Sequence, residues 1–449
     1  MERENSFMRT KPVFPLLVSM SVPMMLSMLI QSLYNIVDSI YVSRLGTDAL
    51  TAVSLAYPLQ NAIVSVGVGI GVGISSAISI YLGSGDQEKA DRAATLGVIL
   101  TFFHCILFVL AGIFITRPFL HLFTDDPDIL KDACDYTYIV LCLSFGALLQ
   151  LAFEKIFQSI GKMKITMYLL IVGCVINIIL DPVLIFGLLG FPALGVAGAA
   201  IATVIGQISA FLLYILVYVR KSYAVRIRLK YVRPDWKIIR RIYSVGIPSS
   251  IMMLLPSVLI SLLNRILASF SDLYVAVLGV YFKLQTFIYM PANGIVQGMR
   301  PILGYNYGAG EHARVRSTIR YSLGCAAAIM LIGTLLSLIL PGQIFTLFDV
   351  DAALMGAGVT ALRIICLGFL VSSIGVIYAG AFEALGNGRD SLIISLLRQF
   401  VVTIPLSYML SHFFGPVGVW IAFPAGELCA AVVAFFLLKT YKKGAFSPF

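Results

Sequence analysis

Twelve apolar segments follow one another along the 449-residue chain, and each is long enough to cross a lipid bilayer as a helix. A transmembrane helix needs about 20 predominantly apolar residues. The segments are continuously apolar rather than alternating, which excludes a transmembrane β-barrel. We therefore expect an all-α polytopic membrane protein. Its predicted spans are 14–42, 49–81, 93–116, 132–160, 164–188, 194–219, 239–269, 274–305, 315–340, 352–384, 389–412 and 417–439.

The composition agrees with a chain that lies mostly in lipid. Only 12% of its residues are charged, whereas about 25% is usual for soluble domains. The net charge of +10 is spread over many short loops. Nucleic-acid binding needs a clustered basic surface instead, so we exclude it. We expect the lipid bilayer to be the partner of this chain.

Lysine and arginine set the expected orientation, because they concentrate in cytoplasmic loops. If both termini are cytoplasmic, the outer loops hold only Arg44, Arg117 and Lys131, while the segment 220–241 on the inner side alone carries nine cations. The apolar run near the N-terminus has no clear small-residue cleavage site, which favours a retained span over a signal peptide. We expect a multi-pass protein of the plasma membrane with both termini in the cytoplasm.

The two halves of the chain repeat each other, and the repeat starts again close to the midpoint of the sequence. Each half has six spans, an even number, so the repeats are parallel and related by an axis along the membrane normal. We predict two pseudo-symmetric six-helix lobes around a central cavity, with an N-lobe at 1–219, a cytoplasmic basic linker at 220–238 and a C-lobe at 239–449. The matching segments are "SVPMM" (21–25) with "GIPSS" (246–250), Leu59–Gln60 with Leu284–Gln285, "YLGSGDQEKA" (81–90) with "NYGAGEHARV" (306–315), "FQSIGKMK" (157–164) with "FEALGNGR" (382–389), and "GVAGAAIA" (195–202) with "GPVGVWIA" (415–422).

Two aspartates lie inside predicted spans of the N-lobe, where a charged group is costly and usually functional. Asp38 lies near the outer end of span 1, and Asp181 lies at a similar depth in span 5. When the two halves are aligned without gaps on these segments, the aspartates fall opposite Leu263 and Leu406. The second lobe is therefore expected to lack this acidic site.

Other polar residues share the depth or the helix face of the two aspartates. Asn177 lies four residues before Asp181, on the same face of span 5, and falls opposite the apolar Val402. Carboxylate, amide and hydroxyl oxygens suit a proton or a hard cation such as Na⁺. Alternatively, these polar residues form contacts that hold neighbouring helices together. We predict a cation-coupling site at Asp38, Asn177, Asp181 and Thr203, supported by a polar stripe of Gln31, Tyr34 and Asn35.

The sequence shows no sign of metal, cofactor or nucleotide chemistry. Beyond Na⁺ at Asp38, Asn177 and Asp181 we expect no metal, because the four histidines are scattered and the seven cysteines lack ligand spacing. No Walker motif is present, so ATP is not expected to drive transport. No nucleophile motif or catalytic domain indicates an enzyme. We expect no cofactor, and the expected coupling ion is H⁺ or Na⁺.

The second half carries charges of its own within predicted spans. Lys283, Arg363, Arg398 and Glu427 lie away from the predicted helix ends. Arg398 and Glu427 are candidates for an ion pair inside the C-lobe; structural pairing and a role in substrate or conformational coupling both stay open. The candidates for the substrate cavity are Tyr34, Tyr57, Gln60, Asn264, Lys283, Gln285 and Met290.

Three segments carry a resemblance to a known family. "SVPMMLSMLIQSLYNIVDSIYVSRLG" in span 1, "NIILDPVLIFG" in span 5 and "GAAIAT" in span 6 resemble the multidrug and toxic compound extrusion (MATE) family, in its prokaryotic DinF-like branch. The resemblance implies a secondary antiporter that expels small organic compounds, often cationic or amphipathic, in exchange for inward H⁺ or Na⁺. We expect it to function as a monomer. A lipid-linked or oligosaccharide flippase of the same superfamily is the alternative.

The resemblance also bears on individual residues. In the DinF-like branch, residues matching Asp38, Asn177, Asp181 and Thr203 form the cation site of the N-lobe. Other branches carry an acidic pair in the C-lobe. Spans 7 and 10 of this chain offer Asn264, Arg265 and Arg363 instead, so no second acidic site is expected.

Overall fold

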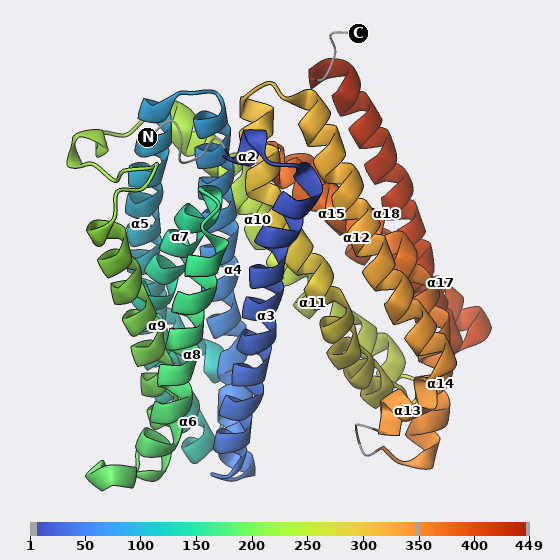
Figure 1. Cartoon of the computed structure of the whole chain (residues 1–449). Coiled ribbons are helices and arrows are strands. Elements are labelled where there is room, and N and C mark those ends of the chain that lie inside the picture. Colours follow the sequence, from blue (N-terminus) through green and yellow to red (C-terminus); the bar gives the residue numbers. More distant parts are fainter. Residues whose placement is uncertain (1–6, 347, 349, 446–449) are drawn as a thin grey trace. The chain divides into compact units, whose positions relative to one another are not determined.

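A computed structural model describes residues 7–346, 348 and 350–445 of the chain. These residues form helices joined by short connections, with no strand among them (Figure 1). Within the described residues, eleven helices are long and apolar enough to cross a membrane, and the bent pair α6–α7 makes twelve if it counts as one span. The predictions of an all-α membrane protein and of its spans are confirmed. Residues 1–6 of the predicted N-lobe and 446–449 of the predicted C-lobe lie outside the described residues.

Helix starts follow ordinary capping chemistry. Asp126 Oδ1 accepts hydrogen bonds from the backbone N–H groups of Asp128 (3.0 Å) and Ile129 (3.1 Å), and Pro127 opens the helix. The elements in chain order are α2 (Phe7–Thr10), α3 (Val13–Ser43), α4 (Thr47–Gly83), α5 (Gln87–Leu120), α6 (Pro127–Cys142), α7 (Phe145–Ser159), α8 (Met163–Phe186), η1 (Leu188–Gly190), α9 (Gly195–Arg220), η2 (Leu229–Tyr231), α10 (Trp236–Ala268), α11 (Asp272–Gly308), α12 (His312–Ile339), α13 (Pro341–Thr346), α14 (Ala352–Ile365), η3 (Cys366–Gly368), α15 (Phe369–Ala384), α16 (Gly388–Leu396), η4 (Leu397–Val401), α17 (Thr403–Phe414) and α18 (Pro416–Ala445).

The helices gather into two compact units, which we call unit 1 and unit 2. Apart from Phe7, the described part of unit 1 is Leu26–Ser250, whereas unit 2 combines Met8–Met25 with the chain from Ile251 onward. The helices α3 and α10 are therefore each divided between the units. The polar segment 220–238 packs on α5 within unit 1, where the Asp91 carboxylate accepts the backbone N–H of Arg226 at 2.8 Å.

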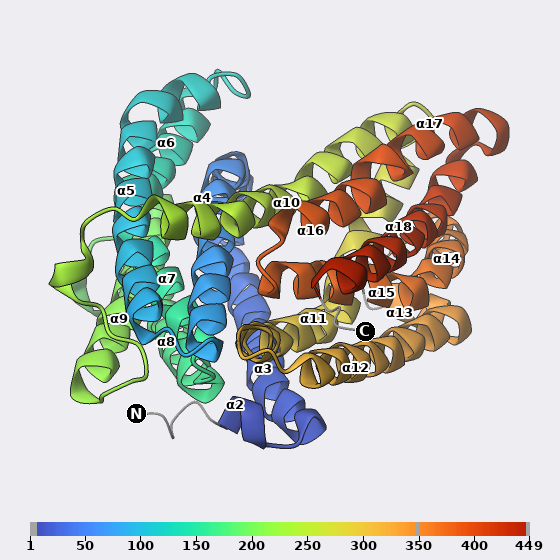
Figure 2. The same ribbon diagram turned by 90° about the horizontal axis from the view of Figure 1, so that it is seen from above.

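The same helix pairs pack together inside each unit. In unit 1, α4 contacts α5, α6 and α7, while α9 contacts α7 and α8 (Figure 2). In unit 2, α11 contacts α12, α14 and α15, while α18 contacts α15 and α17. The fourth span of each half is also interrupted at an equivalent place, by the 44° bend between α6 and α7 and by the 3₁₀ turn η3 between α14 and α15. This common pattern supports the internal repeat.

Matching turns end matching helices in the two halves. Gly85 and Gly310 both adopt left-handed φ values, 77° and 72°. The next residue in each case donates its N–H back into the helix, Asp86 to Tyr81 O at 3.0 Å and Glu311 to Asn306 O at 2.9 Å. Only glycine adopts this conformation without strain, which explains why both repeats keep it.

One element breaks the repeat by a single residue. The π-helical turn η4 adds one residue to span 11. Close contacts at two corresponding glycines show which residues of the two halves match. Gly206 faces Gly173 O and Asn177 Cβ in the first half. In the second half, Gly426 faces Arg398 O and Thr403. Asn177 therefore matches Thr403 rather than Val402.

The same shifted register holds to the end of the span. Gly198 faces Leu184 O and Gly418 faces Leu410 O, so Asp181 matches Ser407 rather than Leu406. The expectation that the second half keeps only apolar residues at these two places is wrong, because the extra residue of η4 leaves no mark in the sequence. Thr403 and Ser407 are both buried. Neither is acidic, so the difference in charge between the halves remains.

Candidate functional site

A close contact between α8 and α9 builds one wall of the candidate site. A Cβ atom on Gly206 of α9 would lie 2.9 Å from Gly173 O and 3.1 Å from Asn177 Cβ of α8. Small residues let helix backbones approach in this way. As a result, the Asn177 Nδ2 group lies 3.3 Å from the Thr203 hydroxyl oxygen and donates to it.

Asp181 lies one turn further along the same face of α8. Its side chain is fully buried, and Asn177 Nδ2 donates to its Oδ1 at 3.4 Å. The following Pro182 lies inside the helix and has no N–H, so the backbone carbonyl of Ile178 loses its usual helical partner. Oxygen atoms therefore outnumber donors at this point of the helix.

Asp38 comes to the same site from α3. Its charge interacts with that of Asp181, so the two carboxylates lie within electrostatic reach of each other. The rings of Tyr41 and Phe186, 6.3 Å apart, join the ends of α3 and α8 beside them. Asp38 and Asp181 each lie five residues from the end of their helix, or about 7–8 Å along its axis.

Three oxygen atoms at this site lack donors in the part of the chain that the structure describes. Among the described residues, no hydrogen-bond partner is found for the buried atoms Asp38 Oδ1, Asn177 Oδ1 and Asp181 Oδ2. No lysine or arginine in the described part of the chain forms an ion pair with either aspartate. A buried carboxylate without a counter-charge is costly. The site therefore has the composition of a receptor for a proton or a small hard cation.

Two tyrosines surround the acids. Tyr34 of α3 lies within hydrogen-bonding reach of Thr203 and within electrostatic reach of Asp38. Tyr136 of α6 interacts with the same acids and donates its hydroxyl to Gln60 Oε1 at 3.2 Å. Tyr136 is not among the residues predicted from the sequence. Its position in the sequence could have identified it, because it lies four residues inside the predicted span 132–160, close to the depth predicted for Asp38.

A cavity of about 100 Å³ adjoins the Asn177–Thr203 pair within unit 1. Of the predicted polar stripe, Gln31 and Tyr34 line this cavity, whereas Asn35 is exposed and does not. The other polar side chains at its wall are Gln150 and Gln207.

The remaining predicted cavity residues are not gathered at this place. Tyr57 of unit 1 is 58% exposed, and Gln60 is engaged by Tyr136. In unit 2, Met290 is buried and Lys283 is exposed. Asn264 and Gln285 are half-buried.

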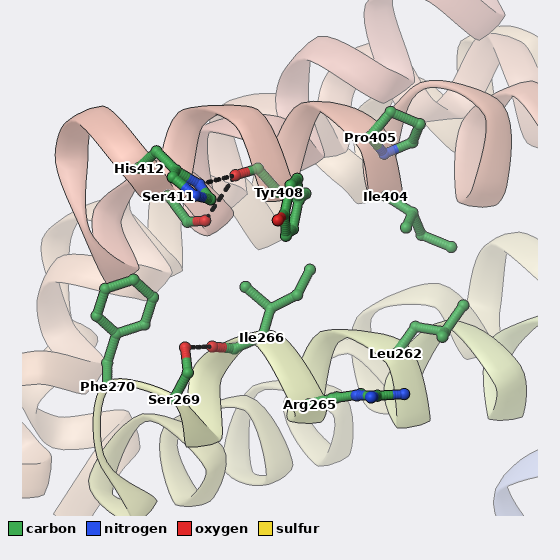
Figure 3. Close-up of a pocket in the computed structure, with 10 residues that line it drawn as sticks. All are labelled: Leu262, Arg265, Ile266, Ser269, Phe270, Ile404, Pro405, Tyr408, Ser411 and His412. Atoms are coloured by element: carbon green, nitrogen blue, oxygen red, sulfur yellow. Dashed lines mark hydrogen bonds between the residues drawn. The ribbon is translucent and has the colours of Figure 1, made fainter.

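A larger cavity, of about 720 Å³, lies in unit 2 between α10 and α17. Ile266 and Tyr408 point toward each other across it (Figure 3). Its lining contains no carboxylate and none of the predicted site residues. The described part of the chain also has no group of three or more His, Cys, Asp or Glu side chains that could hold a metal ion.

Buried ion pairs occur elsewhere in both units. Arg398 and Glu427 form the pair considered from the sequence, with Nε and Oε1 3.5 Å apart. Two pairs were not anticipated: Lys155 with Glu154 at 3.0 Å, and Arg300 with Glu383. In the sequence, Glu154 and Lys155 are adjacent near the end of the predicted span 132–160, and Arg300 and Glu383 lie near the ends of the predicted spans 274–305 and 352–384.

Comparison with known proteins gives concordant matches. The MatE family model matches residues 23–183 and again residues 248–409. The multidrug export protein MepA of Staphylococcus saprophyticus is 29% identical over 431 residues, covering 95% of this chain and 94% of the relative. MepA of Staphylococcus aureus is 27% identical over 448 residues, covering 96% of each.

Solved structures match over nearly the full length. One is a MOP superfamily transporter from Pyrococcus furiosus whose binding pocket is described as having reverse polarity that suggests a different function; its TM-score is 0.92 at 26% identity, covering 99% of each chain. Another is a multidrug resistance MATE family transporter in an outward-facing conformation, with a TM-score of 0.90 at 27% identity, covering 96% of each chain.

Proposed function

The chain belongs to the MatE family of multidrug efflux transporters, and from this premise we propose that it is a secondary antiporter. It exports small organic compounds, often cationic or amphipathic, in exchange for inward H⁺ or Na⁺. Members of the family are transporters, so the chain is a transporter and not an enzyme. Its spans place it in a membrane. The proposed location is the plasma membrane, with both termini cytoplasmic and a monomer as the functional unit.

One observation carries the proposal: two carboxylates with buried oxygen atoms share a site, and no counter-charge is found for them among the described residues. In the proposed cycle, Asp38 and Asp181 take up the coupling ion when they face outward, with Asn177 and Thr203 supplying further oxygens. Neutralising the acids weakens the attraction for a cationic substrate, which leaves. Antiport requires that ion and substrate favour different states of the protein, because a ligand shifts an equilibrium only by its differential affinity.

The substrate path is part of the same proposal. Tyr34 is proposed to belong to both the coupling site and the substrate path, because it lies within electrostatic reach of Asp38 and lines the cavity of about 100 Å³ beside Thr203. The further lining residues proposed are Tyr57, Gln60, Asn264, Lys283, Gln285 and Met290.

The direct test is gradient-driven export of ethidium from energised membrane vesicles, with a pH gradient or a Na⁺ gradient imposed separately. Asp38→Asn and Asp181→Asn are expected to abolish export while the protein still inserts and folds. Asp48→Asn is the matched control, because this acid is exposed at the start of α4 and should leave export unchanged. The gradient that drives the wild type identifies the ion.

Normal export by both aspartate variants would refute the coupling site. The acids would then be structural. If the wild type does not transport ethidium at all but moves a lipid-linked substrate across the bilayer, a flippase would be favoured instead.

A further inference from the structure

Unit 2 contains a charged pair in the middle of its membrane spans, on α18 and on the π-helical turn η4. Arg398 Nε lies 3.5 Å from Glu427 Oε1, and their side chains are only 22% and 12% exposed. Glu427 Oε2 is buried and has no hydrogen-bond partner among the described residues. Arg398 is thus the cation that compensates this carboxylate.

Glycines of the fourth span of unit 2 leave room for the two side chains. A Cβ atom on Gly375 of α15 would lie 4.0 Å from Arg398 Cδ. A Cβ atom on Gly368 of η3 would lie 3.5 Å from Glu427 Cγ. On the other side, Gly426 of α18 allows close contact with the Arg398 carbonyl. The pair therefore occupies a pocket shaped by the backbone of three elements.

The other ionisable groups around Glu427 are weak acids. Tyr281 and Tyr289 of α11 lie within electrostatic reach of both Glu427 and Arg398, and Cys366 of η3 lies near Tyr281. The Tyr289 hydroxyl is already committed, because it donates to Ser372 Oγ at 2.8 Å. Arg398 is accordingly the only cation seen to face Glu427 in the described chain.

The internal repeat shows which residues of unit 1 correspond to Arg398 and Glu427. Gly426 contacts the Arg398 carbonyl as Gly206 contacts the Gly173 carbonyl, so Arg398 matches Gly173. One residue further along α9 and α18, Gln207 matches Glu427. In unit 1, Gly173 and Gln207 line the cavity of about 100 Å³ beside Asn177 and Thr203.

The equivalent place in unit 2 is therefore filled by a guanidinium and a carboxylate. Arginine stays protonated throughout the physiological pH range. Removing one partner of a buried pair leaves an uncompensated charge, which is strongly unfavourable. Glu427 thus has a cation that is fixed to the chain, whereas no such cation is found beside Asp38 and Asp181 among the described residues.

We propose that Arg398 is a tethered counter-cation, which keeps Glu427 charge-paired so that unit 2 takes up no coupling ion of its own. Ion coupling is then confined to Asp38 and Asp181. This inference rests on the proposed antiport. It assigns Arg398 the role of a positioning residue that sets how many ions accompany each substrate.

The test is an infrared titration of the full-length protein in lipid bilayers, following the C=O band of protonated carboxyl groups as the pH is lowered. Wild type and Glu427→Gln are expected to give the same titrating bands. Arg398→Gln is expected to gain one titrating carboxyl group, which disappears again in the double variant Arg398→Gln/Glu427→Gln. Arg398→Lys, which keeps the charge, is expected to gain none.

The double variant keeps the test decisive if Arg398→Gln does not fold, because it removes both charges together. It is expected to export ethidium with the same number of ions per substrate as the wild type. Loss of a titrating band from wild type on Glu427→Gln, or a changed ion number in the double variant, would overturn the inference. The antiport proposal fails separately, if Asp38→Asn and Asp181→Asn leave both the titrating bands and export unaltered.

Discussion

Individual atoms decide what the unit 1 site can bind. Asp38 Oδ1, Asn177 Oδ1 and Asp181 Oδ2 are buried and lack donors among the described residues. Asn177 has a double role, because its Nδ2 donates to Asp181 and to Thr203 while its Oδ1 remains available. Asn177 therefore contacts the acid through its amide nitrogen and offers an oxygen ligand of its own.

Asn177→Ala tests this double role. A hydrogen bond to a charged group is worth about 1.5–3 kcal/mol, which corresponds to roughly tenfold or more in affinity. We expect the half-saturating concentration of the coupling ion to shift about tenfold. The shift is upward if the coupling ion is Na⁺, because Na⁺ loses an oxygen ligand. The measurement is export rate against ion concentration.

Asn35→Ala provides the comparison, because Asn35 lies on the same helix as Asp38 but is exposed. Its ion dependence should equal that of the wild type. An equal shift in both variants would show that the effect of Asn177 is not local to the site.

At the scale of helices, backbone contacts set the position of the acids. Gly198 and Gly206 let α9 approach α8 closely, and Gly418 and Gly426 let α18 approach its neighbours in the same way. These contacts also establish the register of the two halves. Their common pattern explains how one family model can match the chain twice.

The spans and the composition of the site could be predicted from the sequence, because both depend on patterns within one segment. Hydropathy located the helices, and the helical spacing placed Asn177 and Asp181 on one face. The π-helical turn η4 could not be predicted, since a single inserted residue changes no hydropathy pattern. Tyr136 was missed for another reason: its helix α6 carries three aspartates and reads as less apolar than its neighbours.

Gly206→Ala tests the importance of the α8–α9 contact. The added Cβ would lie 2.9 Å from Gly173 O, and overpacking of this kind costs about 1–3 kcal/mol. We expect a lower thermal midpoint and weaker export, because α8 must move away and separate Asn177 from Thr203. The measurements are thermal unfolding of the purified protein and vesicle export.

Gly324→Ala is the matched control. A Cβ atom there meets nothing within 4 Å, and alanine in place of an interior helical glycine is favourable by about 0.5–1 kcal/mol. Equal losses at Gly206 and Gly324 would contradict the proposed role of the contact.

At the scale of the whole chain, the two units pack internally in a similar way but differ in whether a cation of the chain pairs with their buried carboxylates. In the part of the chain that the structure describes, no cation pairs with Asp38 or Asp181 of unit 1, whereas Arg398 pairs with Glu427 in unit 2. The connection between units is made by continuous helices, since α3 and α10 each contribute to both. Asp38 therefore lies on a helix whose first residues belong to unit 2.

The most direct test of the account is substrate-induced ion release from the purified protein in lipid nanodiscs. Ethidium is added to wild-type protein in weakly buffered solution, and the released ion is followed with a pH indicator and a sodium electrode. We predict that ethidium displaces H⁺ or Na⁺ from the wild type, and that Asp181→Asn binds ethidium without releasing either ion. Ethidium binding to the wild type without ion release, or unchanged release from Asp181→Asn, would contradict exchange at the Asp38–Asp181 site.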